Sequence, residues 1–534
     1  MTTKNLQNGS DIRGIALPGI EGENPNLGEK ETISLSKGYI MWLSNKTKKT
    51  FNQLKIAVGM DPRLSGPKLK DYILGVFTAY GAKVYDCGLA STPAMFMSTI
   101  FEEFLCDGAI MITASHLPFN RNGFKYFDKD GGLNKSDIKE IIAYADGEKS
   151  LPEHSNSCAC SSCDKDNCDP CQPEKADLMA RYAKHLRQLI IDGAENGDMP
   201  LEGMKIIVDA GNGGGGFYAT EVLAPLGADI SDSQFLEPDG NFPNHAPNPE
   251  DKTAMASICK AVKDNGADFG LIFDTDVDRS AAVDSQGNPI SRNEIVAMAA
   301  SLIAEDHSGS TVVTDSITSD QLTVFIENCL GLKHLRFKRG YKNVINKSIE
   351  LNNEGIDSQL AIETSGHAAF KENYFLDDGA YLATKIVIKA AKLKQAGEGL
   401  DCLISSLEKP AEAREVRMKL NTEDFGKYGD NVLAWLKAWV NAEDCVGKQT
   451  DPDDPSSPCQ RCHCGTSLVE PNHEGVRINF DKDNGNGWAL LRKSLHDPIM
   501  PLNIESNQIG GCNIIATKLR NFLDQFAALD ISQL

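Results

Sequence analysis

The chain has 534 residues, 41% hydrophobic and 24% charged, which is the composition of a globular protein and excludes a largely disordered one. This length predicts three to four domains, because one hydrophobic core rarely serves more than about 250–300 residues. The formal net charge of −21 excludes nucleic acid and anionic membranes as the main partners, since both select basic surfaces.

The start of the chain is polar and carries no signal-peptide core. No apolar run reaches the roughly 18 residues that a membrane span needs. We therefore expect a cytoplasmic protein without a membrane partner, and a removed plastid transit peptide stays open as an alternative.

One pattern of strand and loop occurs three times in chain order. Each copy has an apolar strand with a polar loop, and a second such strand follows after roughly 50 to 65 residues. The copies are "LKIAVGMDPRLSG" with "DGAIMITASHLP", "MKIIVDAGNGGGG" with "ADFGLIFDTDVDRSAAVD", and "STVVTDSITSDQL" with "SQLAIETSGHAAF". Helix-compatible stretches such as "SGPKLKDYILGVFTAYGA" and "NEIVAMAASLIAED" lie between the strands. Alternating strands and helices predict mostly parallel sheets.

The sequence therefore predicts an α/β protein with three related α/β domains, whose sheets are mixed and mostly parallel. From about residue 408 onward, short strands such as "EGVRINF" lie among helix-like segments such as "EDFGKYGDNVLAWLKAWV", which predicts a smaller C-terminal α+β domain. The expected domains cover residues 1–195, 196–306, 307–407 and 408–534.

In the first copy of the pattern, the loop after the second strand has the most reactive side chains. In "TASHLPFNRNGFKYF", Ser115, His116 and Lys125 follow the apolar run "GAIMI", and open α/β sheets place their chemistry at this end of their strands. A hydrolase would need the Gly-x-Ser-x-Gly turn, which the segment lacks. A serine that carries a phosphoryl group would instead need a divalent cation and basic groups nearby.

The second copy supplies candidate metal ligands in "DTDVDR", which contains Asp274, Asp276, Asp278 and Arg279. Three close carboxylates repel one another unless a cation neutralises them, and oxygen donors suit Mg²⁺ or Mn²⁺. An acidic solvated turn or a Ca²⁺ loop is the alternative. We favour a catalytic metal, because the Gly and Glu of an EF-hand are missing and the segment continues as a strand.

Two further loops suit sugar and phosphate. The loop "ETSGHAAF" offers short polar groups for sugar hydroxyls, although ordinary turn chemistry explains it equally well. The loop "GWALLRKSLHDP" offers Arg492, Ser494 and His496 as a phosphate cradle, with a surface turn as the alternative. Further basic residues could contact anions: Arg13, Arg63, Lys338, Arg339 and Lys342.

Eight of the 15 cysteines gather in "CACSSCDKDNCDPC" and "CQRCHC". These segments fall in polar stretches at about 152–174 and 445–470, and we interpret them as insertions into the core fold. Cys-x2-Cys pairs are typical of Zn²⁺ sites, but redox-active thiols and an inert variable loop stay open.

In order along nearly the whole chain, these motifs resemble the α-D-phosphohexomutase family of phosphoglucomutases and phosphomannomutases. "TASHLPFNRNGFK" resembles the family's phosphoserine loop, "DTDVDR" its Mg²⁺ loop, "ETSGH" its sugar loop and "RKSLHDP" its phosphate loop. Shorter matches are "SDIRG", "DPRLSG" and "PDGNFPNHAPNPE". The resemblance implies four domains around a central cleft. Leu117 replaces a usual Asn, and Leu495, His496 and Asp497 replace the usual Gly-Thr-Glu, which bears on substrate choice more than on the chemistry.

The resemblance implies an isomerase that interconverts hexose 1-phosphate and hexose 6-phosphate through a phosphoserine and a hexose 1,6-bisphosphate. Implied roles are catalysis by Ser115, His116, Lys125, Arg279 and Arg13; Mg²⁺ binding by Asp274, Asp276, Asp278 and phosphorylated Ser115; sugar binding by Glu363, Ser365, His367, Lys338, Arg339 and Lys342; and phosphate binding by Arg492, Ser494 and His496.

Glucose is the favoured sugar and glucose 1,6-bisphosphate the expected activator. Three alternatives stay open: a preference for mannose, a mutase-like binding protein without turnover, and a phosphatase that uses the same metal loop. We expect a monomer or weak dimer.

Overall fold

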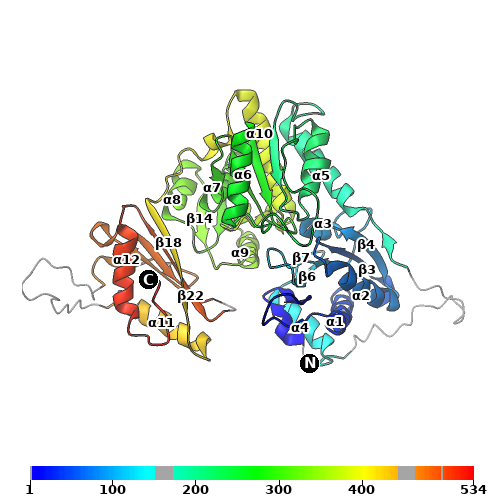
Figure 1. Cartoon of the computed structure of the whole chain (residues 1–534), viewed down its shortest axis with the longest axis horizontal. Coiled ribbons are helices and arrows are strands. Elements are labelled where there is room, and N and C mark those ends of the chain that lie inside the picture. The colour runs from blue at the N-terminus through cyan, green and yellow to red at the C-terminus, as the bar shows by residue number, and fades with distance from the viewer. Residues whose placement is uncertain (1–2, 151–171, 443–462, 495–496) are drawn as a thin grey trace, which may run out of the picture. The chain divides into compact units, whose positions relative to one another are not determined.

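A computed structural model describes residues 3–150, 172–442, 463–494 and 497–534. The chain divides into two compact units, one of residues 1–310 with 348–405 and one of residues 311–347 with 406–534 (Figure 1). The third copy of the repeated pattern is shared between them, because its first strand belongs to one unit and its second strand to the other. Within the described ranges, no helix is both long and apolar enough to cross a bilayer.

The first sheet of unit 1 carries the Ser115 loop. Its strand order is β1-β2-β6-β5-β3-β4-β8, and β7 pairs with β6. β3 runs parallel to β4 and β5, whereas β6 runs antiparallel to β5 and β2. The strands are β1 (Gln7–Asn8), β2 (Asp11–Ile15), β3 (Lys55–Met60), β4 (Lys83–Leu89), β5 (Gly108–Ile112), β6 (Arg121–Asp128), β7 (Gly131–Gly132) and β8 (Glu174–Lys175).

Helices pack on this sheet through apolar faces. In α2, Leu69, Ile73 and Phe77 recur every four residues and are buried, so they form one face of the helix, and a proline stands in the first turn, where its missing N–H costs nothing. The helices of this region are α1 (Glu29–Thr47), α2 (Gly66–Ala79), α3 (Thr92–Met97), α4 (Lys135–Ala145) and α5 (Leu178–Ala194).

The second sheet of unit 1 has the order β12-β11-β10-β9. β9 (Ile206–Asp209) runs parallel to β10 (Phe269–Phe273), and β10 forms an antiparallel hairpin with β11 (Ser280–Asp284). β12 (Pro289–Ile290) completes it, with helices α6 (Lys252–Asn265) and α7 (Asn293–Ala304). All five residues of β10 are buried, so the hairpin loop starts from a fixed strand end.

Unit 1 also contains an antiparallel meander of β15 (Leu360–Ile362), β16 (Ala368–Phe370) and β17 (Leu376–Asp377). Helix α10 (Gly379–Ala396) follows directly and is capped by Asp378, whose carboxylate accepts from Tyr381 N–H at 2.8 Å. The loop between β15 and β16 carries the predicted sugar-binding residues.

Unit 2 contains an antiparallel sheet with the order β18-β22-β21-β20-β19. Its strands are β18 (Glu412–Lys419), β19 (Thr466–Leu468), β20 (Val476–Phe480), β21 (Gly487–Leu491) and β22 (Ile499–Ser506). Helices α11 (Phe425–Val440) and α12 (Gly511–Leu523) share its apolar core. The unit also holds the parallel pair β13 (Thr311–Thr314) and β14 (Lys333–Arg336), with α8 (Asp320–Val324) and the start of α9 (Tyr341–Asn353).

These sheets confirm the predicted fold class of repeated α/β segments and a C-terminal α+β segment. Each strand that follows a functional loop (β6, β11 or β16) runs antiparallel to the strand before that loop. Antiparallel pairs are therefore more frequent than the alternation of strands and helices in the sequence predicted. Short loops force this direction, because a parallel return would need a crossover of a dozen or more residues. The boundaries of the four predicted domains stay predictions.

Candidate active site

Ser115 lies in the loop after β5, and its hydroxyl faces the predicted metal loop. Its Oγ donates to Asp274 Oδ2 at 3.0 Å, and its backbone N–H donates to Thr113 Oγ1 at 2.9 Å. The backbone φ of Ser115 is 48°, a left-handed conformation that few residues other than glycine adopt. The loop therefore holds the serine in a strained conformation that directs its hydroxyl toward acidic groups.

The metal loop is the turn of the β10–β11 hairpin. Asp274, Asp276 and Asp278 are fully buried, and one oxygen from each lies within 4.8 Å of the others. Val277 between them has a φ of 67°, which is costly for a β-branched residue. This arrangement places three carboxylates around one point, and the donor set fits Mg²⁺.

Lys125 on β6 partly neutralises these carboxylates. Its ammonium contacts Asp278 and lies 3.2 Å from Asp276. Burial and the charge of Asp278 hold the pKa of Asp274 well above its usual range. Burial also opposes ionisation of Asp278, but the charges of Lys125 and Arg279 outweigh it and lower the pKa of this carboxyl. A further positive charge at this loop would favour ionisation of Asp274 and so allow all three aspartates to act as ligands.

Arg279 connects the metal loop to the serine loop. Its Nε donates to Asp274 Oδ2 at 3.2 Å, and Nη2 lies 3.4 Å from Ser115 Oγ. Nη2 also donates to His116 Nδ1 at 2.9 Å. Because guanidinium has no acceptor, Nδ1 of His116 must hold a lone pair. Loss of hydration, together with Arg279 and Arg13, lowers the pKa of His116 to about 4, even though part of this residue is exposed.

The expectation that Arg63 contacts an external anion is wrong. Arg63 is fully buried, and its Nε donates to Asp61 Oδ2 at 3.1 Å. Its remaining guanidinium N–H groups donate to backbone carbonyls of the serine loop, namely those of Ser115, Leu117, Pro118 and Arg121. Four carbonyls that converge on one cation leave it no face for a ligand, so Arg63 organises the loop.

Arg13 lies beside the same loop. Its Nη1 donates to the carbonyl of Thr113, and its Nη2 donates to Asp11 Oδ2 at 2.9 Å. Its side chain retains 12% exposure, so it differs from Arg63 in keeping an accessible edge.

The predicted sugar loop is joined to the metal loop by backbone hydrogen bonds. Ser280 N–H donates to Gly366 O at 3.4 Å, and Gly379 N–H donates to Val277 O at 3.1 Å. Gly366 has a φ of 91°, and a Cβ on it would lie 2.5 Å from Ser280 O, so only glycine fits this approach. His367 of this loop lies 3.7 Å from Asp278 of the metal loop, and its Nδ1 lies 3.7 Å from Glu363 and 2.8 Å from Ser365 Oγ.

Unit 2 holds the predicted phosphate-binding residues. Arg492 is 9% exposed, and burial and neighbouring Arg339 lower its pKa. Arg339 faces Asp315 at 4.0 Å, and its backbone N–H donates to Glu474 at 3.2 Å. Ser494 Oγ accepts from Asp497 N–H at 3.2 Å.

Arg339 and Arg492 therefore form a basic pair in unit 2. Lys338 is exposed and Lys342 half-buried. His496 lies outside the described residues.

The zinc prediction cannot be placed in the structure. Of the eight clustered cysteines, Cys464 alone falls in the described ranges, where it is exposed. The cysteine segments stay predictions.

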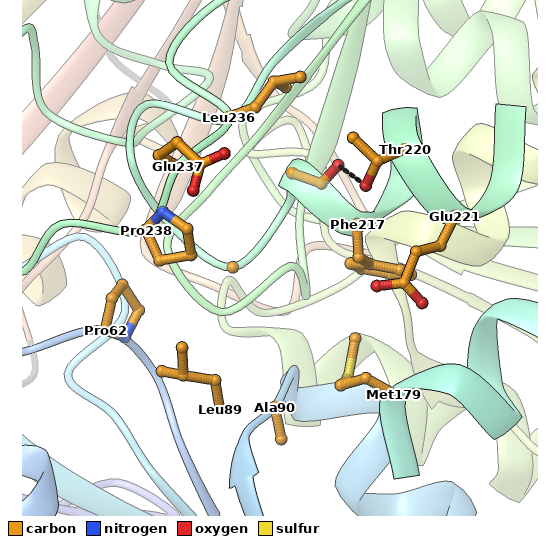
Figure 2. A pocket seen from close by; sticks show the side chains of 12 residues that line it. Pro62, Leu89, Ala90, Met179, Phe217, Thr220, Glu221, Leu236, Glu237 and Pro238 are labelled. Carbon is orange, nitrogen blue, oxygen red and sulfur yellow. Dashed lines mark hydrogen bonds between the residues drawn. The ribbon is translucent and has the colours of Figure 1, made fainter. Parts of the chain in front are cut away.

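A separate pocket of about 260 Å³ contains no predicted site residue in its lining. Figure 2 shows Leu89, Met179 and Phe217 around it, with the carboxylates of Glu221 and Glu237. The N–H of Gly214 in its wall donates to Thr275 O of the metal loop at 2.7 Å. Gly214 therefore connects the wall of this pocket to the metal loop.

Sequence interpretation missed several groups that the fold brings to the site. Thr92 at the start of α3 bonds through its hydroxyl and its N–H to Asp276. Asn248 accepts from Arg279 Nη1 at 3.2 Å, and its segment "PNPE" was noted as a motif without a role. Asp377 lies 3.7 Å from His367 Nε2.

Family models match most of the chain. They are described as phosphoglucomutase/phosphomannomutase alpha/beta/alpha domains I, II and III, and they match residues 4–151, 180–287 and 291–408.

Curated relatives match the chain over most of its length. A phosphomannomutase/phosphoglucomutase of Pseudomonas putida is 27% identical over 456 residues, which is 85% of this chain and 84% of the relative. A phosphoglucomutase of Neisseria gonorrhoeae is 28% identical over 458 residues, 85% of each chain. A crystal structure of a phosphoglucomutase/phosphomannomutase family protein from Burkholderia thailandensis has the same fold, with a TM-score of 0.73, 23% identity and 98% coverage of both chains. The chain belongs to the phosphoglucomutase/phosphomannomutase family of α-D-phosphohexomutases and is an isomerase of this type.

Proposed function

We propose that this phosphohexomutase interconverts hexose 1-phosphate and hexose 6-phosphate through phosphorylated Ser115, with glucose as the preferred sugar and mannose second. The observation that carries the proposal is the Ser115 hydroxyl 3.0 Å from Asp274 in a buried cluster of three aspartates. A phosphoryl group on this oxygen would lie next to a cation site, as phosphoryl transfer requires.

Mg²⁺, held by Asp274, Asp276 and Asp278, would neutralise charge on the phosphoryl oxygens. The chain's own groups do the rest. Arg279 Nη2, 3.4 Å from Ser115 Oγ, is placed to stabilise negative charge on this oxygen as the P–O bond breaks. In net terms the attacking sugar hydroxyl loses a proton and Ser115 Oγ gains one.

Lys125 is the better candidate to move this proton. Nδ1 of His116 accepts from Arg279, so its lone pair is already engaged. Lys125 is held close to Asp276 and Asp278, and we assign it charge stabilisation and proton transfer. Glu363, Ser365 and His367 would bind ring hydroxyls, while Arg339, Arg492 and Ser494 would bind the phosphate that does not react. Lys338, Lys342 and His496 are proposed as further contacts.

Turnover on a panel of sugar phosphates tests this function. The full chain is mixed with Mg²⁺, catalytic glucose 1,6-bisphosphate, and glucose 1-phosphate or mannose 1-phosphate, and ³¹P NMR follows the products. We expect 6-phosphates, with glucose faster, and no product from Ser115→Ala. Release of inorganic phosphate would instead indicate a phosphatase, and lack of turnover on both sugars a binding protein.

A further inference from the structure

We propose that a second divalent cation binds between the metal loop and the sugar loop, held by Asp278, His367 and Asp377. One ligand atom from each of these residues lies within 4.8 Å of the others. His367 Nε2 is 3.7 Å from Asp278 Oδ1 and 3.7 Å from Asp377 Oδ2. Ligands at about 2.1 Å from one ion lie about 3 to 4.2 Å apart, so the imidazole already has coordination spacing from each carboxylate, and the two carboxylates lie within 4.8 Å of each other.

Asp377 gives an independent reason to expect a cation. It is 6% exposed, and within the described ranges neither of its carboxylate oxygens has a hydrogen-bond partner. Oδ1 of fully buried Asp278 also lacks one there. A buried carboxylate without hydrogen bonds is costly unless a positive charge compensates it. An ion at this position would contact both of these orphaned groups.

The charge around the two loops leaves room for two ions. When all are ionised, as metal binding requires, five buried carboxylates face this region against two buried cations: Asp274, Asp276, Asp278, Glu363 and Asp377 against Lys125 and Arg279. One divalent ion among the three metal-loop aspartates neutralises two of the three excess charges and leaves the Asp377 side negative. The second ion should bind more weakly than the first, because it meets this smaller excess.

The donor set selects the kind of cation. An imidazole nitrogen with two carboxylate oxygens suits Mn²⁺, Zn²⁺ and similar ions better than Mg²⁺, which prefers oxygen alone. Asp278 belongs to both groups of ligands, so its carboxylate would lie between two ions, as in two-metal sites with ions about 3.5–4 Å apart. The proposal concerns binding and does not depend on the sugar or on turnover.

Mn²⁺ binding to the full chain tests the proposal, because thiolates in the cysteine-rich segments would compete for Zn²⁺ but disfavour Mn²⁺. We expect two tightly spaced Mn²⁺ ions per chain in equilibrium dialysis, with a spin-coupled EPR signal. Asp377→Asn should retain one uncoupled ion. Its metal-free melting temperature should equal or exceed that of the parent, because burial disfavours an ionised carboxylate at this position and the amide removes that cost.

Asp378→Asn is the matched control. Asp378 is the next residue and is also buried, but its oxygens accept hydrogen bonds from Tyr182, Asn373 and Tyr381, so this variant should retain coupled ions. His367→Gln gives a second route and should also lose the coupling. A single ion in the parent, or a coupled pair that survives in Asp377→Asn, would overturn the proposal. Either result is independent of mutase activity.

Discussion

Replacing Arg63 by Met removes the cation that organises the serine loop while keeping a side chain of similar length. The change leaves Asp61, which is fully buried, without its ionic partner. It also removes the guanidinium that donates hydrogen bonds to four backbone carbonyls, those of Ser115, Leu117, Pro118 and Arg121. Both losses are local, but they act on the loop that carries the reactive serine.

The expected cost follows from the burial of both partners. Removing one member of a buried ion pair costs about 3–5 kcal/mol, which is a large share of the roughly 5–15 kcal/mol by which folded domains are stable. Burial already raises the pKa of Asp61, and Arg63 opposes that rise. In the variant the pKa of Asp61 rises further, so a larger fraction of the folded protein has Asp61 protonated. The loss of unfolding free energy relative to the parent therefore becomes larger as the pH rises.

Urea unfolding of the parent and variants measures this cost, and turnover reports the loop. Arg121→Met is the matched control, since its Arg121–Glu23 pair is partly exposed and should cost about 1 kcal/mol or less. Asp61→Asn with Arg63→Met removes the orphaned charge and should recover part of the stability but little activity. Recovery of full activity in this double variant, or parent-like unfolding of Arg63→Met, would refute the organising role.

Three further outcomes are expected. Gly366→Ala should destabilise the protein by about 2–4 kcal/mol and abolish turnover, because its Cβ would lie 2.5 Å from Ser280 O at a φ of 91°. The control Gly397→Ala, at a φ of 76° with no atom within 4 Å, should cost about 1 kcal/mol. Equal costs of the two variants in urea unfolding would contradict the steric argument. Burial raises the pKa of Glu505 to about 7. Because a raised carboxyl pKa favours the protonated folded state, the free energy of unfolding should fall by about 1.3 kcal/mol from pH 6 to pH 8. Glu505→Gln should remove this pH dependence in denaturant titrations at the two pH values. Mg²⁺ should bind more tightly as the pH rises, and its binding should release protons, because Asp274 has a raised pKa without the ion. Calorimetry in buffers of different ionisation enthalpy measures the number of protons released on binding. Binding without proton release would contradict the raised pKa.

The sequence predicted the features that local pattern determines. The apolar runs before the loops are buried strands, and the alternating aspartates of 274–278 converge because a hairpin turn between β10 and β11 holds them. Ser115 and Arg279 could be predicted for the same reason, since Ser115 lies three residues after the end of β5 and Arg279 directly before the start of β11.

What the sequence could not predict depends on long-range contacts. An arginine in "DPRLSG" has the same local pattern whether it binds a substrate anion or backbone carbonyls, and only the fold surrounds Arg63 with carbonyls. Adjacent Asp377 and Asp378 are likewise indistinguishable in sequence, yet one caps α10 and the other faces His367. Whether His116 can accept a proton likewise depends on its contact with Arg279, a residue 163 positions away, and the sequence alone does not show that contact.

The most direct test of the whole account is the mass and phosphorylation site of the purified chain before and after incubation with glucose 1,6-bisphosphate and Mg²⁺, with Ser115→Ala as the control. The account predicts one phosphoryl group on Ser115, which glucose 1-phosphate removes as bisphosphate forms. A chain that the bisphosphate never phosphorylates, or a phosphoryl group on another residue that persists in Ser115→Ala, would contradict it.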